Sequence, residues 1–391
     1  MKPKVTLISQ LSLSKQGVLS SNRVTIVAFP MESAFGGPPQ VVEKLTFFFK
    51  DKYDLTVITF GHVDPIFFKN IHDTVKVVNQ KTFFNSLYRP VLKLNREVKK
   101  ILRDSDIILI HGVYFPHILL ISFIFGLNGK KFLMPHGVFE IYQQEKSVYR
   151  KRIFDSLLRI TRFWSDTVIM VATESEMIGV RKKFTRSKIL VVGLPVEVPV
   201  KYHLNEPKTL SIAKKIRLIH VGRIAHKKRI DLTLKAVAKL KNEGNDVEFT
   251  IVGGGNYRLL MKLKKLTSEL NIGNQVKFVG EFSHPYIFEM LKQADILVLP
   301  SENENFAISV AEALLVGVPC ITSNCVSLGS LIKEYDAGIV IDKLDAGLLA
   351  NAILTVFKNY TFYSVNTFNL PDLFSPRKVL NRWEIALETE G

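Results

Sequence analysis

The sequence predicts an α/β protein of two doubly wound, Rossmann-like domains that face each other across a cleft. Short apolar runs alternate with amphipathic stretches along the chain, and this alternation is typical of parallel sheets covered by helices on both faces. The runs form two series, separated by the polar, proline-containing segment 195–214. With 391 residues the chain also exceeds the usual size of a single hydrophobic core.

Each series contains apolar runs that we interpret as buried strands. The first series comprises Val24–Phe29, Leu55–Phe60, Ile107–His111, Lys131–Pro135, Thr167–Ala172 and Lys188–Val192. The second comprises Ile216–Val221, Glu248–Val252, Gln275–Val279, Ile296–Pro300, Pro319–Thr322 and Gly338–Ile341. We therefore expect an extension over residues 1–22, a first domain over 23–200, a second over 201–370, and a C-terminal helix within 371–391 that packs back on the first domain. Ligands of doubly wound sheets bind at the carboxyl ends of the strands.

The composition is that of a globular protein, with 47% hydrophobic and 23% charged residues. The two cysteines, Cys320 and Cys325, are too few for a disulfide framework, and we expect buried thiols in a reducing cytoplasm. The longest apolar run, Ile118–Leu127, is about half as long as a transmembrane helix. We expect this run to form a core helix in preference to a helix that dips into a membrane surface.

The net charge of +17 is concentrated in the first half of the chain. Residues 1–200 carry 29 basic and 16 acidic residues, whereas residues 201–391 carry 24 and 20. The basic excess gathers in 93–103, 146–162 and 181–188. A nucleic-acid partner is disfavoured because no nucleic-acid-binding motif accompanies the charge. The pattern indicates an anionic membrane surface or a lipid-phosphate acceptor, and the plainer alternative is a set of solvated basic faces.

Two glutamates eight positions apart, Glu304 and Glu312, give the sharpest functional signal. They follow the apolar run that ends at Pro300, and an amphipathic stretch after them ends at Gly317. We expect Glu304 at a strand–helix junction and Glu312 a little over two turns further on. A helix start offers free N–H groups and the positive end of a dipole, which suit a phosphate. Two acceptors that flank an anion site fit a nucleotide sugar.

The spacing of the two glutamates resembles the E-x7-E signature of retaining glycosyltransferases of the GT-B fold, family 4. Further residues follow the pattern of that family: Ala311, Ala313, Gly317, Pro319 and Ser323. The resemblance runs from about residue 24 to the C-terminus. It implies that Glu304 orients hydroxyls of the donor sugar and that Glu312 holds the ribose. It also places the donor phosphate at a helix start formed by Phe306, Ala307 and Ile308.

A basic turn follows the first apolar run of the second series. Gly222, Arg223 and Lys228 match a Gly-Arg-(five on)-Lys pattern of the same family. This match implies that both cations neutralise the phosphate as it leaves. Arg229 replaces the glycine that usually follows the lysine, which puts the local backbone path in question. Gly253 resembles the family's strand-then-glycine turn and is expected near the donor.

In the first domain, the glycines Gly36 and Gly37 follow the first strand, where backbone N–H groups can approach a ligand closely. His136 ends another predicted strand, and similar enzymes carry a His there, near the donor sugar. His111 also ends a strand and is a second candidate for that role. The segment Thr173–Glu176 fits either a family turn or an ordinary helix cap.

No metal and no cofactor are expected. Asp104 and Asp106 form an Asp-x-Asp pattern, but they precede a predicted strand, where cap or turn chemistry explains them. Positive side chains and a helix start would do the work of a metal ion. The segment Leu194–Glu197 departs from the Asn-Gly-apolar-Asp that is frequent at the domain junction of the family, so contacts made there are expected to differ.

We therefore predict a retaining glycosyltransferase that moves a sugar from a UDP- or GDP-linked donor to an acceptor hydroxyl, in cell-surface polysaccharide or glycolipid biosynthesis. The first domain would bind a glycan or lipid-linked acceptor, and the second the donor. The enzyme would be cytoplasmic, with peripheral association at the inner face of the plasma membrane as an extension of the charge argument. The alternatives are a sugar-nucleotide epimerase or phosphorylase of the same architecture, and a binding-only homologue.

Overall fold

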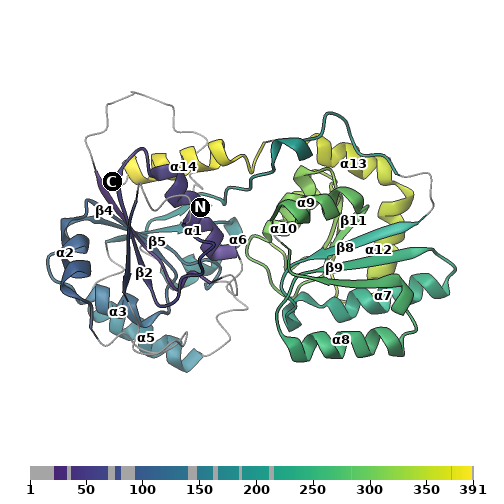
Figure 1. Cartoon of the computed structure of the whole chain (residues 1–391), viewed down its shortest axis with the longest axis horizontal. Coiled ribbons are helices and arrows are strands. Elements are labelled where there is room, and N and C mark those ends of the chain that lie inside the picture. Colours follow the sequence, from purple (N-terminus) through teal and green to yellow (C-terminus); the bar gives the residue numbers. More distant parts are fainter. Residues whose placement is uncertain are drawn as a thin grey trace. The chain divides into compact units, whose positions relative to one another are not determined.

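The computed structural model describes residues 22–32, 37–68, 75–80, 93–139, 148–161, 166–184, 187–210, 215–282, 284–370 and 372–389. The chain divides into two compact units. The first unit comprises Met1–Pro195 together with Pro376–Gly391, and the second comprises Val196–Ser375. Each unit is a parallel sheet with helices against it, as the ribbon of each shows (Figure 1). The predicted fold class, two doubly wound α/β domains, is confirmed.

The first unit is built on a seven-stranded parallel sheet in the order β3-β2-β1-β4-β5-β6-β7. Its strands are β1 (Arg23–Val27), β2 (Asp54–Phe60), β3 (Lys76–Gln80), β4 (Ile107–His111), β5 (Lys130–Met134), β6 (Thr167–Val171) and β7 (Ile189–Val191). β1 pairs with both β2 and β4, so the strand order reverses beside β1. Such a switch point is where doubly wound sheets bind their ligands.

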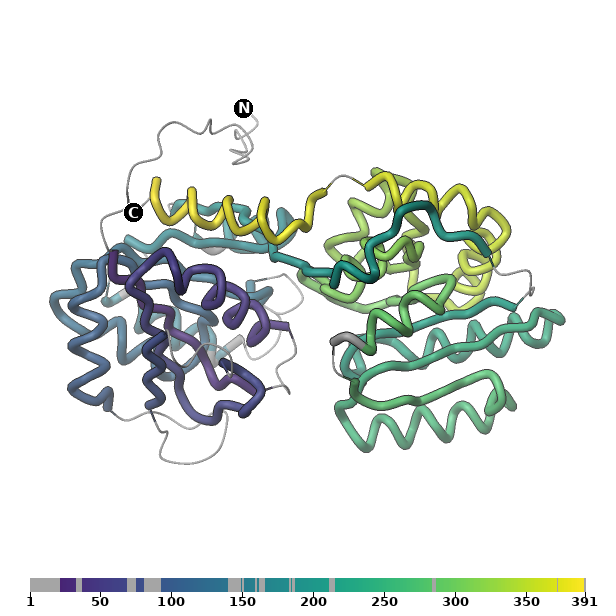
Figure 2. Tube along the Cα trace, turned by 45° about the horizontal axis from the view of Figure 1, so that its top comes forward, coloured from purple at the N-terminus to yellow at the C-terminus, as the bar shows by residue number. Residues whose placement is uncertain are grey.

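Helices cover both faces of this first sheet. They are α1 (Gly37–Phe49), α2 (Arg96–Asp104), α3 (Pro116–Ser122), α5 (Val148–Ile160), α6 (Glu174–Lys183) and α14 (Pro376–Thr389). Side chains of α2, α3, α5 and α6 share one core cluster with the strands. The C-terminal helix α14 runs beside α1 (Figures 1 and 2), where Lys52 pairs with Glu384. Trp383 of α14 is fully buried and donates its indole N–H to the Gly193 carbonyl.

The second unit is built on a six-stranded parallel sheet in the order β10-β9-β8-β11-β12-β13. Its strands are β8 (Ile216–Val221), β9 (Val247–Val252), β10 (Val276–Gly280), β11 (Ile296–Leu299), β12 (Cys320–Ser323) and β13 (Gly338–Ile341). Its helices are α7 (Ile230–Asn242), α8 (Tyr257–Glu269), α9 (His284–Gln293), α10 (Ile308–Leu315), α11 (Gly329–Glu334), α12 (Ala346–Lys358) and α13 (Tyr360–Phe368). The order reverses between β8 and β11, which makes their carboxyl ends the switch point of this sheet.

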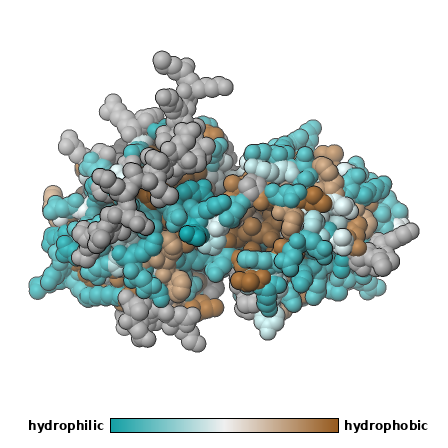
Figure 3. Space-filling view, turned by 90° about the horizontal axis from the view of Figure 1, so that it is seen from above, coloured by the Kyte–Doolittle hydropathy of each residue, from teal (hydrophilic) through white to brown (hydrophobic). Residues whose placement is uncertain are grey.

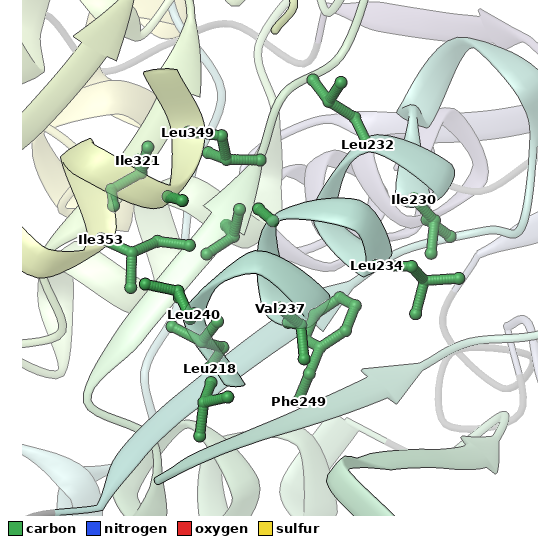
Figure 4. Close-up of a cluster of buried hydrophobic side chains, with 14 of the residues drawn as sticks. Leu218, Ile230, Leu232, Leu234, Val237, Leu240, Phe249, Ile321, Leu349 and Ile353 are labelled. Carbon is green, nitrogen blue, oxygen red and sulfur yellow. The ribbon is translucent and has the colours of Figure 1, made fainter. Parts of the chain in front are cut away.

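The core of the second unit forms where α7 and α12 pack on the sheet. Val237 and Leu240 of α7 lie over Leu218 and Phe249 of the strands, and Ile353 of α12 packs beside them (Figure 4). Each fully buried aliphatic or aromatic side chain stabilises the fold by roughly 1.5–3 kcal/mol. This packing fixes β8 and β11, and with them the loops that follow.

Three findings within the described residues differ from the sequence expectations. The strand β3 (Lys76–Gln80) was not predicted, because Lys76, Asn79 and Gln80 interrupt its apolar character. Cys325 is exposed although Cys320 is buried, so only one thiol fits the expectation. The run Ile118–Leu127 divides: Ile118 and Ile121 are fully buried, while Phe123 and Phe125 are exposed.

No helix among the described residues has both the length and the apolarity that crossing a membrane would require.

Candidate functional site

The switch point of the second sheet brings a lysine and a glutamate together. After β8, the chain passes through Gly222 and Arg223 into a short 3-10 turn, His226–Lys228. After β11, the loop 300–307 carries Glu304. The Lys228 Nζ lies 2.8 Å from Glu304 Oε1, and the Lys227 Nζ lies 3.3 Å from the same oxygen. Two of the four predicted catalytic residues are therefore in direct contact.

Two glycines, Gly222 after β8 and Gly253 after β9, allow the ends of these two strands to approach each other. Gly222 has φ +149° and Gly253 has φ +137°, conformations that side-chain-bearing residues rarely adopt. A Cβ on Gly253 would overlap the carbonyl oxygen of Gly222, so the ends of β8 and β9 could not lie this close. Both residues were predicted from the sequence to lie near the site, and their roles in the backbone are now visible.

Glu304 is held in place by hydrogen bonds of its backbone as well as by the two lysines that contact its carboxylate. Its N–H donates to the Cys325 carbonyl at 3.0 Å, and its own carbonyl accepts from the Ser327 N–H at 3.0 Å. Burial of Glu304 disfavours its charged form, but Lys228 and Lys227 outweigh burial and lower its pKa. The side chain therefore stays ionised at neutral pH.

For Lys228, burial has a larger effect on the pKa than the neighbouring Glu304 carboxylate has. It lowers the pKa of Lys228 from the ordinary value, although Glu304 acts in the opposite direction. The imidazole of His220, on β8 beneath the turn, is fully buried, and burial together with Lys228 lowers its pKa to about 3. His220 is therefore neutral under Lys228. Arg223, by contrast, lies exposed at the surface of the unit.

The helix α10 (Ile308–Leu315) begins shortly after Glu304 in the sequence and carries Glu312, the second glutamate of the motif. Its N-cap residue is Ala307, with φ +56°, a left-handed conformation that is uncommon for a residue other than glycine. Phe306 is 6% exposed and meets Phe374 edge to face at 5.8 Å. Glu312 lies on the buried side of α10 and is 4% exposed. A buried carboxylate on an otherwise apolar helix is unusual unless it serves a bound group or a polar partner.

Arg229 adopts a left-handed backbone conformation. Its φ and ψ are +49° and +42°, in the left-handed region that glycine adopts freely. The guanidinium compensates by pairing with Asp231 through two contacts of 3.1 Å and by reaching Glu302 at 3.5 Å. Arg229 therefore holds a backbone conformation that glycine would adopt without strain.

In the first unit the two candidate histidines contact each other. The His111 Nδ1 lies 2.9 Å from the His136 Nε2. Burial lowers the pKa of His136 to about 3, and burial together with His136 lowers the pKa of His111 well below its ordinary value, so both are neutral at pH 7. His136 has φ +54°, and its ring meets Phe29 edge to face. The ring of His111 lies parallel to that of Trp383 at 6.4 Å.

A buried glutamate fixes the turn that carries His136. Glu176, at 0% exposure, accepts hydrogen bonds from the backbone N–H groups of Gly137 and Ala172. Thr173 caps α6 by accepting from the Glu176 N–H at 3.2 Å, so the cap interpretation of 173–176 is correct. No pattern in the sequence predicts that Glu176 reaches Gly137. The roles of Lys227, His220 and Trp383 were likewise missed, because each depends on contacts between distant segments.

The remaining predicted residues are placed as follows. Gly37 is the first residue of α1, whereas Gly36 lies outside the described residues. Asp106 accepts from the Arg23 N–H at 2.8 Å and pairs with the Arg23 side chain, so it serves local structure, and Asp104 is the last residue of α2. Within the described ranges, no group of three or more His, Cys, Asp or Glu side chains is arranged to hold a metal ion.

Sequence comparison finds similarity over most of the second unit. Residues 203–366 match the family model of glycosyl transferases group 1. The chain is 29% identical to the amylovoran biosynthesis glycosyltransferase AmsK of Erwinia amylovora over 241 residues, which are 58% of the chain and 55% of AmsK. It is 29% identical to the alpha-D-kanosaminyltransferase of Streptomyces kanamyceticus over 35% of each chain. The chain thus spans about half or less of these curated relatives.

Structural comparison establishes the fold. The Anabaena protein Alr3699/HepE, solved in complex with UDP-glucose, superimposes with a TM-score of 0.74 at 15% identity, covering 94% of this chain and 99% of that one. WaaG, described as a glycosyltransferase involved in lipopolysaccharide biosynthesis, superimposes with a TM-score of 0.65 at 16% identity, covering 92% and 98%. Identities this low show the GT-B fold alone.

Proposed function

We propose that the protein is a glycosyltransferase that moves a sugar from a nucleotide-diphosphate donor to an acceptor hydroxyl. The observation that carries the proposal is the buried contact between Lys228 and Glu304 at the carboxyl ends of β8 and β11. It lies at the switch point of the unit that matches the family model of glycosyl transferases group 1. AmsK, named for amylovoran biosynthesis, supports polysaccharide or glycolipid assembly as the setting.

The second unit would bind the donor through its diphosphate. Lys228 and Arg223 would neutralise the charge that develops on the departing phosphate, with backbone N–H groups at the start of α10, near Ala307 and Ile308, as further donors. Glu304 would accept hydrogen bonds from hydroxyls of the sugar, and Glu312 from the ribose. Gly222 and Gly253 would let the donor approach the backbone. The complexes of HepE with UDP and with UDP-glucose support a nucleotide-sugar donor of this kind.

The reaction we propose retains the configuration of the sugar. The bond between the anomeric carbon and the phosphate oxygen breaks, and a bond to the acceptor oxygen forms on the same face. The acceptor proton passes to the leaving phosphate, so atoms and charge balance without a metal ion. The transition state would be oxocarbenium-like, and it would gain most from cations beside the phosphate.

The first unit would bind the acceptor. His136 would contact the sugar as a neutral hydrogen-bonding group, in keeping with its lowered pKa. Gly36 and Gly37 would contribute backbone N–H groups. The acceptor we propose is a growing glycan or a lipid-linked sugar phosphate, because the half of the chain that contains this unit carries most of the positive charge. The enzyme would then work on the cytoplasmic side of a membrane.

The test is a donor screen with the full chain. The protein is incubated with UDP- and GDP-sugars, and the released nucleoside diphosphate is measured, with Lys228→Ala and the exposed α8 variant Lys262→Ala beside it. We expect release from one donor class, its loss in Lys228→Ala and no change in Lys262→Ala. An epimerase would convert the donor without releasing nucleotide. A binding-only homologue would bind nucleotide and release none.

A further inference from the structure

The outer face of α5 exposes an unbroken stripe of large apolar side chains. Tyr149, Ile153, Leu157 and Ile160 are 78%, 50%, 36% and 74% exposed. They are spaced four, four and three residues apart, which places them on one face of the helix. The opposite face carries Leu158, which is fully buried in the core of the unit. The helix is therefore apolar on both sides, although only one side packs against the protein.

A second exposed apolar group lies at the end of the neighbouring helix. Phe123 and Phe125, directly after α3, are 50% and 88% exposed. α3 and α5 pack against each other on the same face of the sheet. Both helices lead back to the start of a parallel strand, so their C-terminal ends lie at the same edge of the sheet. Phe123 and Phe125, just after the end of α3, therefore lie toward the same edge of the sheet as Ile160 at the end of α5.

The charge around this stripe has one sign. Residues 146–162 contain six basic residues and a single acid, Asp155. Asp155 is buried on the inner side of α5, so the solvent-facing side of the helix presents no carboxylate. Arg152 is exposed beside Ile153. After α3, Arg103 of α2 donates its Nε hydrogen to the Phe125 carbonyl at 3.2 Å.

Apolar exposure alone would not identify a partner. Hydrophobic residues also gather on the surface of the second unit (Figure 3), and α8 exposes Tyr257 and Met261. The α5 stripe differs in its length and in its two exposed phenylalanines. A second copy of the chain would bring an equally basic helix against it, at a net charge of +17 per chain. Basic side chains beside an apolar stripe with aromatic residues instead fit the interface of an anionic bilayer.

We propose that α5, together with Phe123 and Phe125, is a membrane-docking surface that inserts shallowly into an anionic lipid bilayer. The apolar stripe would enter the boundary between head groups and acyl chains, and Arg103 and Arg152 would contact lipid phosphates. This deepens the proposed function, on which its purpose rests: an enzyme that glycosylates a lipid-linked acceptor gains from being held at the membrane. Binding itself needs neither donor nor acceptor, so the two proposals can fail separately.

The experiment is co-sedimentation of the full chain with vesicles of phosphatidylcholine, alone or mixed with phosphatidylglycerol, at low and high salt. We expect binding to the anionic vesicles only, weakened by salt. The double variant Ile153→Gln/Ile160→Gln should weaken this binding by about tenfold, and Arg152→Glu by about tenfold. These side chains are exposed, so the folded unit should tolerate the changes. Release of nucleotide from a soluble donor should not change in either variant.

The matched control is Tyr257→Gln/Met261→Gln on α8, a helix that is also basic and also exposes two apolar residues. It should bind vesicles as the wild type does. Equal binding to neutral and anionic vesicles, no binding at low salt, or loss of binding in the α8 variant but not in the α5 variant would each overturn the proposal. So would a dimer in sedimentation velocity that Ile153→Gln/Ile160→Gln dissociates without any effect on vesicle binding.

Discussion

The ammonium group of Lys228 lies 2.8 Å from the carboxylate of Glu304, and both side chains are largely removed from solvent. The contact joins the segments that follow β8 and β11, the two strands at which the order of the sheet reverses. Removing one partner of such a pair leaves the other charge buried and uncompensated. A bound diphosphate would add negative charge beside Lys228 and compete with Glu304 for it. When a donor binds, Lys228 could therefore pair with its phosphate, and the Glu304 carboxylate could accept hydrogen bonds from the sugar hydroxyls.

Replacing either proposed phosphate-binding cation should affect turnover more than binding. For Lys228→Ala and Arg223→Ala we expect kcat to fall by about 10²-fold or more, because the charge they neutralise is greatest in the transition state. Affinity for the bare nucleoside should change little. Steady-state kinetics and calorimetric titration measure the two quantities. Lys262→Ala, an exposed lysine of the same unit, is the control. An unchanged kcat in either variant would remove that residue from the mechanism.

From the left-handed backbone conformation of Arg229 we predict how two substitutions change the free energy of unfolding. In Arg229→Gly, relief of the backbone strain should roughly offset the loss of the pairs with Asp231 and Glu302. Arg229→Ala loses the same pairs and keeps the strain, so we expect it to be less stable than Arg229→Gly by about 1 kcal/mol. Urea unfolding monitored by circular dichroism measures the difference. If the alanine variant were as stable as the glycine variant, Arg229 would not be strained in solution.

His111 should act on the reaction through His136. In His111→Phe the ring would still lie against Trp383, but His136 would lose the partner of its Nε2. We expect a lower kcat with little change in the KM of the donor, because the ring of His136 is no longer held in one orientation and tautomer. The control is His117→Phe, which replaces another buried histidine of this unit that stacks on Phe60. Equal kinetics in the two variants would rule out the positioning role.

Three histidines of the first unit have lowered pKa values, and from these we predict acid lability. Burial lowers the pKa of His117 and of His136 to about 3, and that of His111 well below its ordinary value. In the unfolded chain an imidazole titrates near pH 6.5. As the pH falls below about 6.5, the unfolded chain takes up protons that the folded chain does not. Each such histidine should then lower the free energy of unfolding by up to about 1.4 kcal/mol per pH unit.

Tryptophan fluorescence is a suitable probe for this loss, because both tryptophans of the chain belong to the first unit. Urea unfolding at pH 7 and pH 5.5 should show a clear fall in the midpoint, and His117→Phe should make the fall smaller. A midpoint that does not depend on pH in this range would show that the histidines are not buried as neutral groups.

The fold could be predicted from the sequence because its signals are local. Apolar runs such as Ile296–Leu299 identify buried strands, and Asn95 and Thr173 each precede a helix that they cap. The strand β3 (Lys76–Gln80) escaped prediction because polar residues occupy three of its five positions. An edge strand tolerates such residues, since one side of it has no neighbour in the sheet.

The candidate site could be predicted only in part. Glu304, Lys228 and Gly222 belong to motifs with a fixed spacing, and the structure brings Glu304 and Lys228 together. The support around them depends on contacts between distant segments, such as Glu176 with Gly137 and Trp383 with His111. No local pattern announces such contacts, because the side chains involved are common and their meeting is decided by the packing of whole elements.

The central claim, transfer of a sugar with retained configuration and without a metal ion, can be tested by one measurement. Proton NMR of the full chain with the donor found in the screen, in the presence of EDTA, follows the anomeric signal of the sugar as nucleotide is released. We expect the donor to be consumed despite chelation, and the first product, whether a glycoside or the free sugar before mutarotation, to have the anomeric configuration of the donor. An inverted first product, or consumption that EDTA abolishes and manganese restores, would contradict the account.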